Sequence, residues 1–265
     1  MTEALALRFL GVGNARASEL GSAAAVLEAD GEPLLLIDCG PRTLDDYRTC
    51  YGDAIPKAVF ITHLHLDHIG GIEALFYRAY FADQGLVRLH VPAALVPALH
   101  AKLAGSSFVL SEGNASFWDA FQLLPVGEFM WLRGLLLSVF PVRHSGYHQA
   151  FGLCLPGAFA YTGDTRPIPE VLGHFARSGE PVFHDCGVEG SPAHAGVEDI
   201  AREYSEEQKS RLVLYHYESE AAGRELERRG FRVAKAGERF LLKPPLPVSR
   251  QPAADPETAS LTRVV

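Results

Sequence analysis

The chain has 265 residues, 48% of them hydrophobic and 21% charged, with a formal net charge of −8. This composition is that of a globular protein with one α/β core, and the acidic balance argues against a protein that grips long nucleic acids through basic stripes. No apolar stretch is long enough to span a bilayer, no secretory signal is present, and the four cysteines form no Cys-x-x-Cys pair. We therefore expect a cytoplasmic protein with no membrane or large polyanionic partner.

Short apolar runs bounded by glycine recur along the chain, and their length predicts strands rather than helices. Helical patterns separate some of them, so the mixture predicts an α/β fold. The predicted strands lie at 5–13, 22–30, 32–40, 57–63, 87–92, 135–144, 150–157, 158–164 and 211–216, and the predicted helices at 72–82, 93–104, 168–178 and 195–208.

The chain changes character at Pro244. The remaining stretch carries five of the 17 prolines, few large apolar residues and no periodicity. Such a composition cannot bury enough apolar surface to offset the entropy of ordering. We predict one domain over 1–243, followed by a disordered, proline-rich tail over 244–265.

The densest group of metal-ligand side chains follows the apolar run at 57–63. The stretch ITHLHLDHIGG places His63, His65, Asp67 and His68 within six positions. In an extended segment alternate side chains share a face, so His63 and His65 project together, whereas Asp67 and His68 fall where the chain turns into a helix. One short loop can thus supply ligands to two neighbouring metal ions.

Three further candidate ligands each end a predicted strand: His144 after LLLSVFPVR, Asp164 after AFAYTG and His216 after RLVLY. Strand ends on a rigid sheet place ligands accurately. His148 is an alternative to His144, which we favour because it directly follows the strand pattern. The histidines without ligand neighbours are expected to be structural or superficial: His90, His100 and His174.

These residues resemble the HxHxDH motif and the later His, Asp and His of the metallo-β-lactamase superfamily, over roughly residues 5–242. The resemblance implies an αββα sandwich of two mixed sheets flanked by helices. It also implies two metal ions per chain, with Asp164 bridging them. One ion would be held by His63, His65 and His144, and the other by Asp67, His68 and His216. We expect two Zn²⁺, although Mn²⁺ or Fe also accept these ligand types.

Two neighbouring cations would hold one bridging water as hydroxide near neutral pH, which is the nucleophile of a hydrolase. The stretch PVFHDCGVEGSPAHAGVEDI at 181–200 resembles the ribonuclease Z branch of the superfamily. That resemblance implies a proton-handling pair, Asp185 and His194, although Asp185 replaces the usual Glu and is one methylene shorter. The predicted catalytic residues are Asp67, Asp185 and His194, with His184 in a supporting role.

Two cysteines offer alternative chemistry. Cys186 could be a metal ligand and Cys39 a nucleophile. We disfavour both, because a His/Asp ligand set is already complete and neither thiol has a partnered base nearby in sequence.

The stretch GGIEALFYRAYF at 70–81 is similar to the cyclic-nucleotide-degrading relatives of this branch, the anti-Pycsar proteins. The basic arm with which short-form ribonuclease Z enzymes grip transfer RNA has no counterpart here. We therefore predict a dinuclear metal-dependent phosphodiesterase whose partner is a small phosphodiester, a cyclic nucleotide. The alternatives are a tRNA 3′-processing endonuclease, an ester or thioester hydrolase, an iron redox enzyme and a non-catalytic nucleotide sensor. A local basic patch would favour the RNA substrate, and its candidates are Arg8, Arg16, Arg42, Arg78, Arg88 and Arg143.

Aromatic residues are concentrated at 76–82 and 117–131. They exceed what the helices of a sandwich need for their own packing, and apolar surface of this kind usually marks an interface. We predict a homodimer, with stacking on a nucleobase as the alternative role of these rings.

Overall fold

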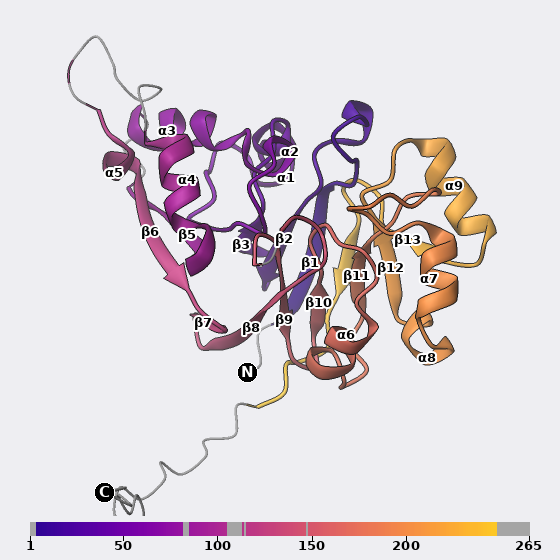
Figure 1. Cartoon of the computed structure of the whole chain (residues 1–265). Helices are drawn as coiled ribbons and strands as arrows, with labels where there is room; N and C mark the ends of the chain where they lie inside the picture. The colour runs from indigo at the N-terminus through magenta and orange to yellow at the C-terminus, as the bar shows by residue number, and fades with distance from the viewer. Residues whose placement is uncertain (1–3, 82–84, 105–112, 114, 147, 248–265) are drawn as a thin grey trace, which may run out of the picture.

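The computed structural model describes residues 4–81, 85–104, 113, 115–146 and 148–247, which form two mixed seven-stranded sheets (Figure 1). The first sheet has the order β14-β1-β2-β3-β4-β5-β6 and the second β13-β12-β11-β10-β9-β8-β7. The first sheet comprises β1 (Leu5–Gly11), β2 (Ala24–Ala29), β3 (Glu32–Ile37), β4 (Ala58–Phe60), β5 (Val87–Pro92), β6 (Phe121–Val126) and β14 (Arg239–Leu241). The second comprises β7 (Phe129–Leu132), β8 (Leu135–Pro141), β9 (Phe151–Leu155), β10 (Phe159–Tyr161), β11 (Val182–Asp185), β12 (Leu212–Tyr215) and β13 (Arg232–Val233).

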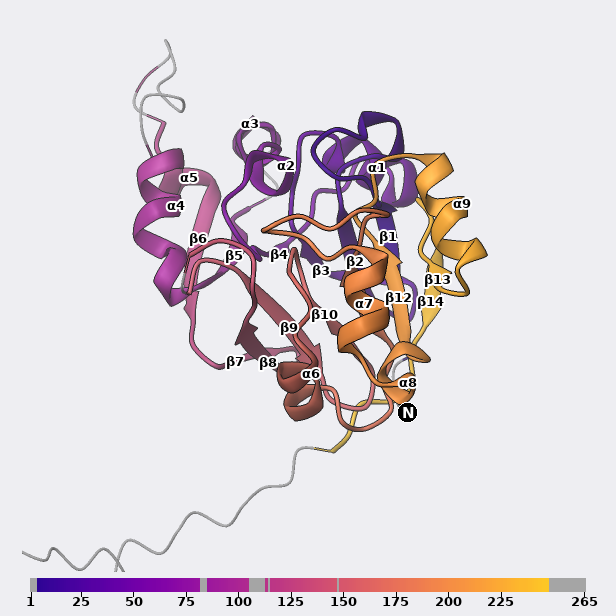
Figure 2. The same cartoon turned by 45° about the vertical axis from the view of Figure 1, so that its right-hand side comes forward.

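Helices flank both sheets. Figures 1 and 2 show α1 to α5 gathered beside the first sheet and α6 to α8 beside the second, with α9 next to β13. Their bounds are α1 Thr43–Tyr51, α2 Leu66–Ile69, α3 Ile72–Phe81, α4 Val96–Leu103, α5 Phe117–Ala120, α6 Pro169–Phe175, α7 Val197–Glu203, α8 Glu206–Lys209 and α9 Glu220–Arg228, with short 3₁₀ turns at Ser18–Leu20 and Ala93–Leu95. The predicted α/β sandwich is confirmed. Within the described part of the chain, no helix has the length and apolar character needed to cross a membrane.

The core lies between the sheets and is rich in aromatic rings. Phe9 of β1 lies 5.4 Å, centroid to centroid, from both Phe183 of β11 and Tyr215 of β12. Phe240 of β14 packs 5.0 Å from Phe183. Phe9, Phe183 and Tyr215 are fully buried. Such large rings supply much of the apolar burial that holds two sheets together.

The last strand joins the sheet of the first one. β14 pairs antiparallel with β1, and the Leu242 amide donates to the Leu5 carbonyl at 3.0 Å. Beside this pairing the buried carboxylate of Glu28 on β2 accepts hydrogen bonds from Arg8, Tyr51 and Arg239. A buried carboxylate needs such partners, so these contacts stabilise the charge.

The structure departs from the predicted elements at several positions. The predicted helix at 195–208 is two helices, because Tyr204 between α7 and α8 adopts an extended conformation with ψ 141°. Helices α1, α5 and α9 were not predicted. Strands β6, β7, β11, β13 and β14 were not predicted either. Residues 248–265 of the predicted tail and residue 82 of the predicted helix at 72–82 lie outside the described residues, and the domain boundary at 243 stays a prediction.

Candidate metal centre

A cluster of histidines and aspartates lies at the edge of the sandwich where strands of both sheets end. Strands β3 and β4 run parallel in the first sheet, and β10, β11 and β12 run parallel in the second, so their carboxyl ends meet at common edges. The residues that follow these strands, and β8, are Asp38 after β3, His63 and His65 after β4, His144 after β8, Asp164 after β10, Asp185 at the end of β11 and His216 after β12.

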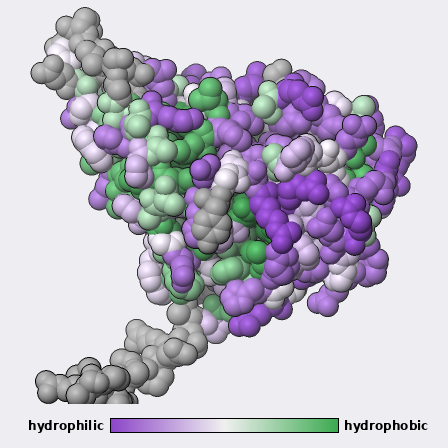
Figure 3. All heavy atoms as spheres, in the orientation of Figure 1, coloured by the Kyte–Doolittle hydropathy of each residue, from purple (hydrophilic) through white to green (hydrophobic). Residues whose placement is uncertain are grey.

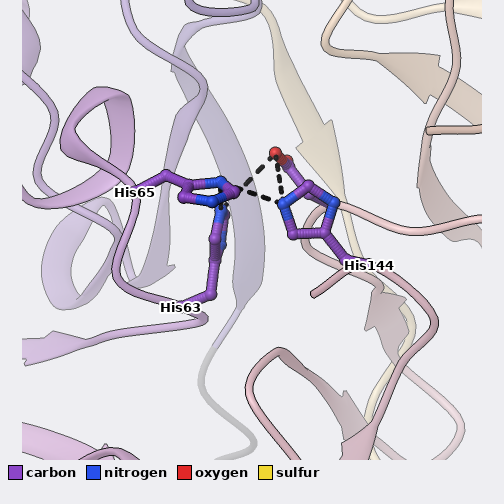
Figure 4. A group of neighbouring side chains, drawn as sticks. His63, His65 and His144 are labelled. Atoms are coloured by element: carbon purple, nitrogen blue, oxygen red, sulfur yellow. Dashed lines mark hydrogen bonds and ion pairs between the residues drawn. The ribbon is translucent and has the colours of Figure 1, made fainter. Parts of the chain in front are cut away.

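Three histidine rings converge on one point. Figure 4 shows His63, His65 and His144 turned toward one another. Nδ1 of His65 lies 3.1 Å from Nε2 of His63 and 3.0 Å from Nε2 of His144. Oδ2 of Asp164 lies 3.6 Å from His63 Nε2 and 3.9 Å from His144 Nε2. Ligand atoms around a tetrahedral zinc ion stand about 3.3 Å apart, so this group fits one metal ion.

A second group shares the same aspartate. Nε2 of His68 lies 3.2 Å from Asp164 Oδ2 and 3.5 Å from Asp67 Oδ2. Nε2 of His216 lies 3.3 Å and 3.7 Å from the same two oxygens. The donor atoms within each group all lie within 4.8 Å of one another. The structure therefore brings the seven predicted ligands together as two groups that meet at Asp164.

The remaining nitrogens of four of these imidazoles are held by hydrogen-bonding groups. His144 donates from Nδ1 to the carbonyl of Ala193 at 2.9 Å, and Nδ1 of His63 lies 3.0 Å from Thr62 Oγ1. Nδ1 of His68 lies 2.8 Å from Asp38 Oδ2, and Nδ1 of His216 lies 3.3 Å from Asp185 Oδ1. Contacts of this kind leave Nε2 free to bind a metal ion and fix the ring orientation.

Asp38 contacts the cluster although the sequence pattern did not single it out. It is fully buried, and it accepts hydrogen bonds from the Thr62 amide at 2.8 Å and the Thr62 hydroxyl at 2.7 Å as well as contacting His68. Its backbone has φ 62°, and His216 has φ 69°, a left-handed conformation that is strained for residues other than glycine and is found at functional sites. Its position directly after the apolar run LLLI, like that of Asp164 after AFAYTG, was the available signal.

Several buried polar atoms in the cluster lack hydrogen-bond partners. Among the described residues, His68 Nε2, His216 Nε2 and Asp164 Oδ1 are buried and accept or donate no hydrogen bond. Buried polar atoms are normally satisfied, because leaving one unpaired costs roughly 1 to 3 kcal/mol. The two imidazole atoms, His68 Nε2 and His216 Nε2, lie 3.2 and 3.3 Å from Asp164 Oδ2, so this donor set fits a bound cation.

The charges of the cluster are strongly coupled. Burial opposes ionisation of Asp164, but the neighbouring His216, His68 and His63 hold its pKa well below its usual range. Burial likewise opposes protonation of His216, yet Asp164 and Asp185 raise its pKa to about 10. Without metal the site therefore balances a buried carboxylate with imidazolium groups, whose protons a cation would displace.

Asp185 and His194 form a direct hydrogen bond, although Asp185 is one methylene shorter than the Glu usual in the ribonuclease Z branch. Asp185 Oδ2 lies 2.8 Å from His194 Nδ1 and also accepts from the Thr165 amide at 2.9 Å. Asp185 is fully buried, whereas the His194 side chain is 33% exposed. Burial opposes protonation of His194, but its hydrogen bond to Asp185 and the nearby carboxylates raise its pKa. Asp185 therefore holds the partly exposed ring of His194 through Nδ1, and Nε2 makes no bond to Asp185.

His184 is hydrogen-bonded to the backbone of Asp185 and to Tyr204. Its Nδ1 donates to the Asp185 carbonyl at 2.6 Å, and the hydroxyl of Tyr204 lies 2.7 Å from its Nε2. The same hydroxyl accepts from the Ile168 amide at 2.7 Å. Tyr204 makes these contacts from an extended backbone conformation between α7 and α8.

The alternative residues lie away from the donor groups. Burial raises the pKa of the Cys39 and Cys186 thiols, which keeps them protonated and poorly nucleophilic. His148 lines a neighbouring hollow rather than the cluster. Of the remaining histidines, His90 is buried in β5, His100 stacks 5.4 Å from Trp118, and His174 lies in α6.

A cavity of about 520 Å³ opens above the cluster. Its floor includes His65, Asp67, Asp164, Asp185, His194 and His216, and its wall includes Asn14, Arg16, Glu189, Ser191 and Glu218. Of the six arginines considered for a basic patch, Arg16 alone lines this cavity, whereas Arg8, Arg78 and Arg143 pair with acidic residues elsewhere. Among the described residues that line this cavity, the other five candidate arginines contribute no positive charge.

Comparison with known proteins agrees with this geometry. A family model described as anti-Pycsar protein Apyc1 matches residues 5–240. The anti-Pycsar protein Apyc1 of Saccharibacillus brassicae is 32% identical over 218 residues, which cover 80% of this chain and 89% of that protein. The metallo-β-lactamase fold protein YhfI from Bacillus subtilis has a TM-score of 0.69 at 14% identity, covering 90% of this chain and 99% of YhfI. The short form of human tRNase Z has a TM-score of 0.64 at 18% identity, covering 91% of this chain and 100% of that one. The metallo-β-lactamase fold that the motif implied is confirmed.

Proposed function

The chain belongs to the anti-Pycsar protein Apyc1 family, and on that basis we propose that it is a metal-dependent hydrolase that opens a small cyclic nucleotide to a linear monophosphate. The observation that carries the proposal is the position of Asp164, whose Oδ2 lies within 4 Å of His63, His68, His144 and His216. A carboxylate shared by two donor groups is what a dinuclear site requires.

The proposed ligands are those implied by the motif, with His63, His65 and His144 on one ion, Asp67, His68 and His216 on the other, and Asp164 on both. Zinc is the proposed metal, because imidazole and carboxylate in tetrahedral spacing suit it. Two such cations supply an activated water at neutral pH and balance the charge that grows on the phosphoryl oxygens.

His194 is the proposed proton donor to the leaving oxygen. The bond between its Nδ1 and Asp185 leaves Nε2 as the nitrogen that can face a substrate, and the raised pKa favours the protonated form. General acids of this kind contribute roughly 10² to 10⁴ in rate. Asp185 orients the ring and stabilises its charge.

The cavity favours a small substrate over a folded RNA. A volume of about 520 Å³ matches a mononucleotide-sized ligand. Binding of transfer RNA needs several phosphate contacts from lysine or arginine, and Arg16 alone of the six candidate arginines lines this cavity. The similarity to short-form tRNase Z is one of fold and does not indicate a shared substrate.

A homodimer with a cytoplasmic location completes the proposal. Figure 3 shows apolar surface gathered over the α4 and β6 side of the molecule, opposite the polar surface over α7 and α9. Tyr80, Phe81 and Trp118 are 38%, 63% and 54% exposed there. Four free thiols, three of them buried, fit a reducing compartment.

The test is a screen of purine and pyrimidine cyclic mononucleotides with zinc-loaded protein, alongside precursor transfer RNA, p-nitrophenyl acetate and bis(p-nitrophenyl) phosphate. We expect conversion of cyclic to linear monophosphates and no site-specific cleavage of the RNA. Cleavage of the RNA at its 3′ side without turnover of any cyclic nucleotide would reverse the assignment. Faster hydrolysis of the acetate than of the diester would make the protein an esterase.

A further inference from the structure

The wall of the cavity is chemically different from its floor. It is formed by three loops that follow strand ends, residues 14–16 after β1, residues 187–191 after β11 and Glu218 after β12. Arg16, Glu189 and Glu218 are the charged residues of this wall, so its net formal charge is negative. A phosphate group drawn to cations at the floor is disfavoured at this wall.

The loop that carries Glu218 is held in place by backbone bonds. The His216 amide donates to the Val12 carbonyl at 2.7 Å, and the Asn14 amide donates to the Tyr217 carbonyl at 3.3 Å. Gly13 also forms a β-bridge with Tyr217. Glu218 therefore projects from a backbone that is fixed relative to the metal ligands.

The Glu218 side chain reaches across to the loop after β11. A Cβ atom placed on Gly187 would lie 3.3 Å from Glu218 Oε2 and 3.2 Å from the Glu189 carbonyl oxygen. Gly187 does not have a positive φ, so the space beside Glu218, and not the backbone conformation, distinguishes this glycine. The carboxylate thus lies over Gly187 on the cavity wall.

The two wall glutamates differ from the buried acids of the fold. Glu28 and Glu180 each accept several hydrogen bonds. Neither Glu189 nor Glu218 has a hydrogen bond or ion pair with any residue that the structure describes. A carboxylate only accepts hydrogen bonds, so on the wall of a substrate cavity it selects for N–H or O–H donors.

We propose that Glu218 determines specificity by accepting a hydrogen bond from the nucleoside part of the substrate, an amino or ring N–H of the base or a ribose hydroxyl. This inference rests on the proposed function. The phosphodiester occupies the floor, the uncharged nucleoside lies along the wall, and nucleotides with additional phosphate groups are disfavoured by the two glutamates. Substrate recognition is then separate from the metal ligands and from His194.

The test compares Glu218→Ala and Glu218→Gln in the zinc-loaded protein, with Glu220→Gln as the control that removes a nearby charge outside the cavity. Loss of a charge-assisted hydrogen bond raises KM for the best cyclic nucleotide by roughly 10- to 100-fold in Glu218→Ala. Glu218→Gln, which keeps an acceptor oxygen, recovers part of that loss. Hydrolysis of bis(p-nitrophenyl) phosphate, which has no nucleoside, changes less than about twofold. Equal losses on both substrates would overturn the proposal.

Analogues identify the donor. If the base donates the hydrogen bond, removing its amino group lowers the affinity of the wild type for the substrate but not that of Glu218→Ala. If the ribose donates, a 2′-deoxy substrate has the same effect. If both analogues bind less tightly to the wild type and to Glu218→Ala alike, the proposed role of Glu218 is wrong. Inhibition of bis(p-nitrophenyl) phosphate hydrolysis by nucleoside monophosphates, compared with inorganic phosphate, gives a second measurement. It reports nucleoside binding even if no cyclic nucleotide is turned over, so failure of the proposed function is distinguished from failure of this inference.

Discussion

Nδ1 of His194 lies 2.8 Å from Oδ2 of Asp185, while the other carboxylate oxygen lies 3.3 Å from Nδ1 of His216. One buried aspartate thus orients both the proposed proton donor and a proposed metal ligand. Changes at Asp185 are expected to affect two properties, proton transfer and metal affinity, whereas changes at His194 are expected to affect one.

For His194→Ala we expect retention of both metals and of the fold, with a loss of roughly 10² to 10⁴ in kcat on cyclic nucleotides. Nitrophenolate leaves without much protonation, so the loss on bis(p-nitrophenyl) phosphate should be smaller. The measurements are metal content by elemental analysis and kcat on both substrates. Equal losses on the two substrates would mean that His194 positions the substrate and does not protonate it.

Asp164→Ala should lose the second metal ion, because this carboxylate is the only group in both proposed ligand sets. We expect the wild type to contain two metal ions per chain and the variant no more than one, with activity lost as well. Asp45→Ala is the matched control, since Asp45 is an exposed aspartate of α1 that pairs with Arg78. A fully loaded wild type with one metal per chain would contradict a dinuclear centre.

Asp38→Asn tests whether Asp38 orients the His68 ring for metal binding. The amide keeps the size of the side chain but weakens its interaction with His68 Nδ1 at 2.8 Å, and losses of this type typically cost 10- to 100-fold in metal affinity. Competition with a chelator of known affinity measures the change. Unaltered zinc affinity in a folded variant would show that His68 does not depend on Asp38 for its ligand geometry.

Glu28→Gln should reduce stability at neutral pH. Burial opposes ionisation of Glu28, but hydrogen bonds from Arg239, Arg8 and Tyr51 lower its pKa below that of the unfolded chain. Its contribution is therefore present above the unfolded pKa of about 4.3 and is lost as pH falls through the folded value. We expect the free energy of unfolding of the variant to be roughly 1 to 3 kcal/mol smaller than that of the wild type at pH 7. Below about pH 4 this difference should shrink.

Urea unfolding of metal-free protein measures this difference without interference from acid-induced metal loss. Glu32→Gln, at an exposed position on β3, is the control and should change stability by less than about 0.5 kcal/mol. If the difference in free energy of unfolding between Glu28→Gln and the wild type does not vary with pH, the effect comes from packing and not from charge.

Replacement of Phe81 and Trp118 by serine should convert the proposed dimer to a monomer. Both rings are more than half exposed on the apolar side of the molecule, whereas the exposed Leu241 on β14 lies in another element and serves as control when replaced by serine. Light scattering should give twice the chain mass of 28.8 kDa for wild type and control. A monomeric wild type at micromolar concentration would refute the dimer.

The proposed ligands could be identified from local sequence patterns. His63 and His65 follow β4, Asp67 and His68 lie in the adjoining helix α2, and His144, Asp164 and His216 each end an apolar run. Asp38 obeys the same strand-end rule but carries a residue type that is also common in turns, and only its contact with His68 across 30 residues reveals its role. Such long-range pairing is not readable from one sequence.

The missed helices have a physical reason. α9 buries Ala222, Gly223 and Leu226, of which one is a large apolar residue, and α1 buries Thr43, Leu44 and Tyr47 among charged neighbours. The buried faces of these helices carry few large apolar residues, so both helices depend on tertiary packing for their stability. The break at Tyr204 likewise depends on His184, 20 residues earlier in the chain.

The hydrogen bond between Leu242 and Leu5 places the two ends of the folded domain side by side. Proteins with adjacent ends tolerate circular permutation, in which the ends are joined by a short linker and the chain is opened elsewhere. The turn at Arg133 and Gly134, between β7 and β8, is a suitable opening because both residues have positive φ and lie outside the metal cluster. If the chain is cut there and its original ends are left unjoined, the HxHxDH loop lies on one fragment and His144, Asp164 and His216 lie on the other. Uptake of the proposed metal ions would then require both fragments, which is the property that a split reporter uses.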